Sequence, residues 1–157
     1  MIYTLRREQH LGCDITTAWN FFTAPTNLAR ITPGTMRFKV LSDLGDRPIY
    51  RGMIIDYEVA PLFGIGMHWR TKISQIEEGK SFTDLQIAGP YKLWRHFHEF
   101  IADDLGVIIK DRVDYELHWG ILGRTAHALI VKRKLNHIFD YRHKVLETLF
   151  NKKSIPV

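Results

Sequence analysis

The chain is poor in the residues that mark secreted, membrane-spanning or cofactor-dependent proteins. Its 157 residues include a single cysteine, Cys13, which excludes an internal disulfide and fits a reducing compartment. No apolar stretch approaches the length of a membrane span, and the first residues, MIYTLRREQHLG, lack the apolar region of a signal peptide. No cofactor motif is present, and no serine or cysteine stands in a recognisable catalytic setting. We therefore expect a cytoplasmic protein with no cofactor and no stable membrane insertion.

The composition is that of a globular protein with a sizeable core. Hydrophobic residues make up 45% of the chain and charged residues 25%, and the length fits one domain over residues 1–157. The net charge of +5 comes from scattered lysines and arginines, and the densest runs, at 132–134 and 152–153, are not interleaved with aromatics. We interpret this charge as a solvated helix face and expect no nucleic-acid partner, with an anionic macromolecule or ligand as the alternatives.

Hydrophobic periodicity predicts an α+β fold. Alternation of apolar and polar residues indicates about seven strands, two short helices after the first strand, and a long C-terminal helix. We expect strands at 2–11, 36–41, 53–59, 67–76, 80–88, 92–102 and 107–117. We expect helices at 17–23, 25–31 and 124–150, the last preceded by a turn at 120–123.

The segment 84–120 contains the most informative pattern. Its turn residues predict two hairpins, around Asp103–Gly106 and around Ala88–Tyr91. Pairing Asp103 with Gly106 places Phe100 opposite Ile109, His98 opposite Asp111 and Trp94 opposite Tyr115. A slip of one residue would turn the charged row Lys110, Arg112, Asp114 and Glu116 inward, so we assign that row to solvent.

The same parity predicts a cluster of polar side chains on the inner face of the sheet. Pairing in the first hairpin sets Asp84 near His96 and Gln86 opposite Trp94. The inward cluster then contains Asp84, Gln86, His96, His98 and Asp111. Burial of a carboxylate is unfavourable unless it is paired, and His98 is the expected partner of Asp111.

Arg142 is an irregularity in the last helix, because it falls near the centre of an otherwise apolar stripe. Its guanidinium would either extend past the sheet to solvent or meet an inner carboxylate, Asp84 or Asp111, or an anionic ligand. A small error in the helical phase would also move it to the flank of the stripe.

The order of elements, with ITPGTMRF at 31–38, DLQIAGPYKLWRHFHEF at 84–100, DRVDYELHWG at 111–120 and IFDYR at 138–142, resembles the START/Bet v 1-like (SRPBCC) superfamily. These stretches are similar to an uncharacterised bacterial ligand-binding branch related to polyketide cyclase/dehydrase-like proteins. The resemblance implies a helix-grip fold, in which a curved antiparallel sheet wraps the long helix and encloses a cavity.

The implied cavity suggests a small hydrophobic or amphipathic ligand, such as a lipid, an isoprenoid or a polyketide-like compound. The alternatives are a cyclase or dehydratase that uses His98 and Asp111 as acid and base, and a protein-interaction module with a filled core. The expected lining and ligand-binding residues are Tyr57, Trp69, Phe82, Asp84, Gln86, Trp94, His96, His98, Phe100, Asp111, Tyr115, Phe139 and Arg142.

The polar cluster itself allows three interpretations. The first is a buried network of satisfied hydrogen bonds that shapes the pocket. The second is an acid–base centre, and the third is a metal site built on the His96-x-His98 pair. An HxH pair is common by chance, and a third ligand depends on the inferred register. We therefore expect the network and no metal.

Overall fold

The computed structural model describes residues 1–45, 47–60, 64–118, 125 and 130–151. Its strands are β1 (Tyr3–Leu11), β2 (Lys39–Val40), β3 (Ile54–Val59), β4 (Met67–Glu77), β5 (Ser81–Ala88), β6 (Leu93–Asp103) and β7 (Gly106–Glu116). Its helices are α1 (Ile15–Phe22), α2 (Asn27–Arg30) and α4 (Lys132–Phe150), with a 3-10 turn η1 (Gly34–Met36). The predicted α+β class, with seven strands and two short helices after the first strand, is confirmed.

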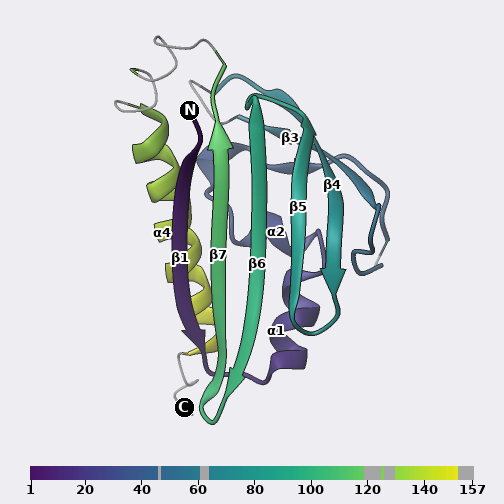
Figure 1. The fold of residues 1–157 in the computed structure, drawn as a ribbon, viewed down its shortest axis with the longest axis vertical. Coiled ribbons are helices and arrows are strands. Elements are labelled where there is room, and N and C mark those ends of the chain that lie inside the picture. Colours follow the sequence, from purple (N-terminus) through teal and green to yellow (C-terminus); the bar gives the residue numbers. More distant parts are fainter. Residues whose placement is uncertain (46, 61–63, 119–124, 126–129, 152–157) are drawn as a thin grey trace.

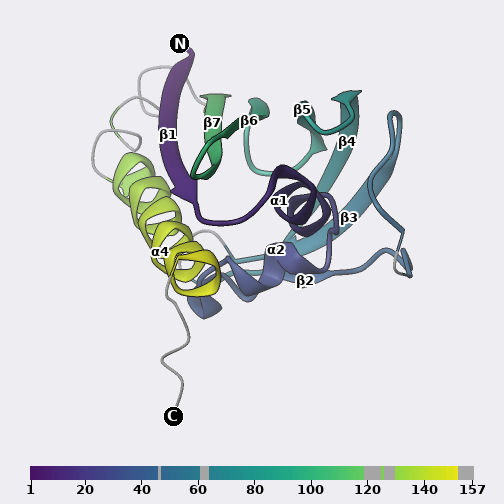
Figure 2. The same ribbon diagram turned by 90° about the horizontal axis from the view of Figure 1, so that it is seen from below.

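The seven strands form one antiparallel sheet in the order β1-β7-β6-β5-β4-β3-β2 (Figure 1). Strands β2 to β7 follow one another as a meander, and β1 joins the sheet beside β7. Register shifts between β4 and β5 interrupt regular pairing near Thr71 and Ser74, and such irregularities bend a sheet. Figure 2 shows the resulting curvature, with α4, α1 and α2 on the concave side.

The register of the last hairpin agrees with the turn-and-parity prediction. Asp103 pairs with Gly106, Phe100 with Ile109, His98 with Asp111 and Trp94 with Tyr115. In the preceding hairpin Asp84 pairs with His96, as expected, and the described ladder ends at Leu85 and Arg95. The alternating side chains of β6 that face the helices are all buried: Trp94, His96, His98 and Phe100.

Several expected boundaries shifted, and two of these shifts have a clear local cause. The strand expected at 36–41 is reduced to Lys39–Val40, because η1 precedes it and Arg37 takes a left-handed conformation with φ 46° that interrupts extended pairing. Helix α1 begins earlier than expected, at Ile15, because the Asp14 carboxylate accepts a hydrogen bond from the Thr17 amide at 2.9 Å. The expected turn at 120–123 and the helix start at 124 lie outside the described residues.

The assignment of Asp114 to solvent was wrong. Its side chain is on the outer face of β7 with Arg112, but only 5% of it is exposed. It accepts hydrogen bonds from Thr4 at 2.7 Å, from Arg95 at 2.7 Å and from Arg112 at 3.2 Å. Long side chains on three neighbouring strands therefore cover a short carboxylate, which the alternation of a single strand does not reveal. Burial opposes its ionisation, but the hydrogen bond from Arg95, with those from Thr4 and Arg112, lowers the pKa of Asp114.

Helix α4 is joined to β1 along its length. Arg7 donates to the Asn136 side chain at 2.6 Å, and Gln9 donates to the His143 carbonyl at 2.9 Å. At the end of the helix, Asn151 accepts from the Gly12 amide at 2.6 Å and donates to the His10 carbonyl at 2.9 Å. Within the described residues, no helix combines the length and the apolar character needed to cross a membrane.

Candidate functional site

A cavity of about 560 Å³ lies between the concave face of the sheet and the helices α1, α2 and α4. Apolar side chains make up most of its lining. Three of the polar lining residues, Asp84, His96 and His98, lie together on β5 and β6, and α4 contributes Lys134 and Arg142. Nine of the predicted side chains line it: Tyr57, Trp69, Phe82, Asp84, Trp94, His96, His98, Phe139 and Arg142.

Two predicted aromatic lining residues lie in the packed core instead. Phe100 is covered by α1, with its ring centroid 5.2 Å from that of Trp19 and 5.5 Å from that of Phe22. Tyr115 is covered by Tyr91 and Trp94, at 6.0 and 6.2 Å. Parity places a side chain on the inner face of the sheet, but packing from other elements decides whether it borders a cavity.

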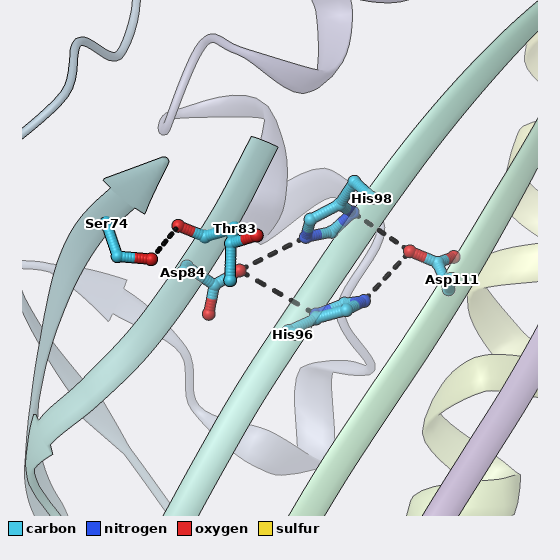
Figure 3. Close-up of polar contacts among 6 residues, drawn as sticks. All are labelled: Ser74, Thr83, Asp84, His96, His98 and Asp111. Carbon is cyan, nitrogen blue, oxygen red and sulfur yellow. Dashed lines mark hydrogen bonds and ion pairs between the residues drawn. The ribbon is translucent and has the colours of Figure 1, made fainter. Parts of the chain in front are cut away.

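The two remaining polar candidates also lie away from the cavity lining. Gln86 does not join the polar cluster, because its amide donates to the Tyr91 carbonyl at 2.6 Å and accepts from the Tyr91 amide at 3.3 Å. Gln86 therefore stabilises the β5–β6 turn through these two hydrogen bonds. Asp111 lies on the opposite side of the imidazoles from Asp84 (Figure 3). It borders a small separate hollow that Arg142 also lines.

The cluster consists of two imidazoles between two carboxylates (Figure 3). Nε2 of His96 lies 2.8 Å from Asp111, and Nε2 of His98 lies 3.1 Å from Asp84, both as hydrogen bonds. Nδ1 of His98 lies 2.9 Å from Asp111, but it makes no aligned hydrogen bond, and Nδ1 of His96 lies 3.8 Å from Asp84. The predicted approach of His98 to Asp111 is present as a distance, whereas the aligned hydrogen bonds run diagonally across the register.

Neighbouring groups fix the two rings. The imidazoles lie face to face with centroids 3.7 Å apart, and Phe82 stacks on His98 at 4.2 Å. Phe139 of α4 meets His96 edge-on at 5.7 Å. Beside Asp84, the Ser74 hydroxyl donates to the Thr83 carbonyl at 3.2 Å, next to the irregular pairing of β4 and β5.

The two histidines differ in their electrostatic environment. Burial and the neighbouring His98 lower the pKa of His96 despite the two carboxylates. Burial also opposes the charge on His98, but Asp111 and Asp84 outweigh it and raise the pKa of His98 above 6.5. Burial opposes ionisation of Asp111 as well, yet His96 and His98 hold the pKa of Asp111 well below 3.8. Of the two stacked rings, His98 therefore takes up a proton more readily than His96.

Arg142 neither reaches solvent nor forms a close ion pair. It is 7% exposed, and its guanidinium carbon lies 4.9 Å from the centroid of the Phe139 ring. Among the described residues no carboxylate lies within ion-pair distance, and its buried Nε has no hydrogen-bond partner. Burial lowers the pKa of Arg142, and the charges of Asp111 and Asp84 partly offset this.

Several lining residues were missed by the sequence reasoning. The short helices contribute side chains that read as ordinary core residues, and Tyr91 comes from a turn. Leu135 and Ile138 belong to the apolar stripe of α4, so the helical periodicity could have identified them as lining residues. The principal missed residues are Phe21, Phe22, Leu28, Ile31, Tyr91, Leu135 and Ile138.

Comparison with known proteins gives a match through structure. No protein-family model and no curated protein matches the sequence. A structural-genomics protein from Chromobacterium violaceum superposes with a TM-score of 0.72 at 13% identity, covering 96% of this chain and 98% of that one. Ginseng major latex-like protein 151 from Panax ginseng gives 0.68 at 13% identity, covering 97% and 99%. Norcoclaurine synthase from Thalictrum flavum gives 0.64 at 14% identity, covering 95% and 96%.

These likenesses extend over nearly the whole chain on both sides, and they agree with the curved seven-stranded sheet and the long last helix. The chain therefore has the Bet v 1-like helix-grip fold.

Proposed function

We propose that this protein binds a small hydrophobic or amphipathic ligand in the cavity between the sheet and α4. The observation that carries the proposal is the cavity itself, about 560 Å³ with a mostly apolar lining and one polar cluster. Sites for small molecules have volumes of about 300–1,000 Å³ and combine apolar walls with a few placed polar groups. A cavity of this kind supports ligand binding over the interaction module, for which we expected a filled core.

The polar end of such a ligand would face β5 and β6. His98 and Asp84 offer a hydrogen-bond donor and acceptor there, and Trp69 and Trp94, whose ring centroids are 5.1 Å apart, form an apolar wall. Burial raises the pKa of Tyr57, so its phenol stays neutral and also donates or accepts a hydrogen bond. A lipid, an isoprenoid or a polyketide-like compound with one oxygenated end has the matching distribution of polarity.

The first test fills the cavity. Leu135 projects from α4 into the lining and is buried, so Leu135→Trp is expected to weaken binding of the neutral dye Nile red at least tenfold, a change of about 1.4 kcal/mol. The matched control is Leu105→Trp, because Leu105 lies in the β6–β7 turn and is 81% exposed. Fluorescence titration measures both. Equal affinities for the two variants would contradict the proposal, and native mass spectrometry of the wild type looks directly for a co-purifying molecule.

A reaction in the same cavity is a second candidate function, of the cyclase or dehydratase type. The observation that favours it is the pair of cavity-lining histidines whose pKa values are displaced in opposite directions, an arrangement suited to an acid and a base. The structural neighbour norcoclaurine synthase, determined with a transition-state analogue, shows that a protein of this fold can be an enzyme.

Replacement of His98 separates binding from reaction. Glutamine keeps a hydrogen-bonding group but cannot exchange a proton near neutral pH, so His98→Gln is expected to retain Nile red affinity within about tenfold. A general base contributes about 10²–10⁴-fold to a rate. A compound that the wild type transforms and His98→Gln leaves intact would establish the reaction instead of binding alone.

A further inference from the structure

We propose that Asp84, His96 and His98 form a site for a divalent transition-metal ion, such as zinc, on the wall of the cavity. This inference goes beyond ligand binding and does not depend on it. From the sequence we expected no metal, because a third ligand beside the HxH pair depended on the inferred register. The structure has that register, and it brings Asp84 of β5 opposite His96 of β6.

The three possible donor atoms lie close together. One nitrogen of each imidazole and one carboxylate oxygen of Asp84 all lie within 4.8 Å of one another. The Asp84 oxygen is 3.1 Å from Nε2 of His98 and 3.8 Å from Nδ1 of His96. Zinc bonds to nitrogen and oxygen of about 2.0–2.2 Å in a tetrahedral arrangement place neighbouring donors about 3.3–3.5 Å apart. The two oxygen–nitrogen separations, 3.1 and 3.8 Å, lie on either side of that value.

The outer nitrogens of both rings face a single carboxylate on the far side. Asp111 lies 2.8 Å from Nε2 of His96 and 2.9 Å from Nδ1 of His98 (Figure 3). Histidines that bind metals commonly donate their other N–H to a carboxylate, which fixes the tautomer and aims the free nitrogen at the ion. Here one buried carboxylate is placed to do this for two rings at once.

The arrangement leaves an electron-rich centre. When both outer N–H groups point toward Asp111, the two inner nitrogens and the Asp84 oxygen are three unprotonated donors within 4.8 Å of one another. A proton satisfies one nitrogen–oxygen pair, whereas a metal ion satisfies all three donors. Nδ1 of His98 is buried, lies 2.9 Å from Asp111 and lacks an aligned hydrogen bond. A small rotation of the ring would align Nδ1 with Asp111.

The site would keep open coordination positions. Asp84, His96 and His98 all line the cavity, and three protein ligands with an open position are typical of metal sites that bind or activate a small molecule. A divalent ion with the carboxylates of Asp84 and Asp111 and the Arg142 guanidinium gives the cluster one net positive charge. The chemical class that fits the open position is therefore an oxygen donor, neutral or anionic, on the polar end of a cavity ligand.

The test is metal titration of purified, tag-free, chelator-treated protein. Isothermal titration with zinc chloride is expected to show one equivalent bound, and cobalt chloride should give a visible spectrum of nitrogen and oxygen coordination. Asp84→Asn and His96→Gln are expected to weaken zinc binding at least tenfold. Asp111→Asn keeps all three ligands and is expected to weaken it by about 10–100-fold, through loss of their orientation.

The matched control is His68→Gln, because His68 is exposed and lies 2.6 Å from Asp56, a histidine–carboxylate pair outside the cavity. It is expected to bind zinc as the wild type does. Wild-type protein that binds no zinc, or whose binding is lost in His68→Gln and kept in Asp84→Asn, would overturn the proposal. The variants of Asp84, His96 and Asp111 are independent of one another, so the site can be located even if one of them fails to fold. Nile red titration of the metal-free protein tests ligand binding separately.

Discussion

Replacing Asp111 with alanine is expected to lower the free energy of unfolding by about 3–5 kcal/mol. Asp111 is buried, holds a hydrogen bond from His96 at 2.8 Å and lies 2.9 Å from His98. Its removal leaves the buried His96 and His98 without this partner and the buried Arg142 guanidinium without one of the two carboxylates whose charge offsets its burial. Chemical denaturation at neutral pH measures the loss, and Asp111→Asn, which keeps one acceptor oxygen, is expected to lose less.

Asp114→Ala is the informative control on the same strand. Asp114 is as buried as Asp111, but side chains of its partners Arg95 and Arg112 are about half exposed. Water can solvate both guanidinium groups after the carboxylate is removed, so we expect a loss of about 1–2 kcal/mol. Equal losses in the two variants would show that the inner cluster contributes no more than the outer one.

The stabilisation from Asp111 also depends on pH in a definite direction. Its pKa in the folded protein is held well below 3.8, so the unfolded chain takes up this proton first as the pH falls. The contribution is therefore fully present above about pH 5 and is lost as the pH falls through 3.8 toward the folded pKa. Wild type and Asp111→Ala are expected to converge in stability over that acidic range.

Gly106→Ala is the second substitution with a large expected effect. Gly106 begins β7 with φ +150°, and an added Cβ would lie 2.1 Å from the backbone carbonyl oxygen of Leu11. That oxygen belongs to the end of β1, so neither the glycine nor its neighbour can move without disturbing strand pairing. We expect a loss of stability about 1–3 kcal/mol greater than in the control Gly79→Ala.

Gly79 is a suitable control because it also has positive φ, +73°, but no atom lies within 4 Å of an added Cβ. Its substitution therefore measures backbone strain alone, about 1–2 kcal/mol. Thermal or urea denaturation of both variants separates strain from steric overlap. Similar denaturation midpoints for the two variants would mean that the end of β1 can move away from the β6–β7 hairpin at little cost in stability.

The fold was predictable because local signals agreed with one another. The turn at Asp103–Gly106 and the alternation of charged and apolar residues on the last strand allow only one register, and His98 indeed lies opposite Asp111. These signals act within one hairpin, where the sequence separation is small. The same signals failed for Asp114, because side chains from two other strands, Thr4 and Arg95, cover it.

The sequence predicted which histidines and aspartates lie in the polar cluster, but not how they pair. Parity placed Asp84, His96 and His98 on the inner face, and the structure puts all three on the cavity wall. It could not show that His98 bonds diagonally to Asp84, since that depends on ring rotation and on stacking with Phe82. Parity also could not show that α1 covers Phe100, because the packing of a helix on a sheet depends on contacts between distant segments.

The place of β1 beside β7 has a consequence for how the chain folds during synthesis. Strand β1 is made first, but its only neighbour in the described sheet is the last strand, and Thr4 contacts Asp114 across 110 positions. Its tie to the end of α4 spans more, with Gly12 and Asn151 separated by 139 positions. Contacts this distant form slowly and leave the backbone hydrogen-bonding groups of β1 unpaired in the meantime. The nascent chain therefore completes its sheet only after β7 leaves the ribosome.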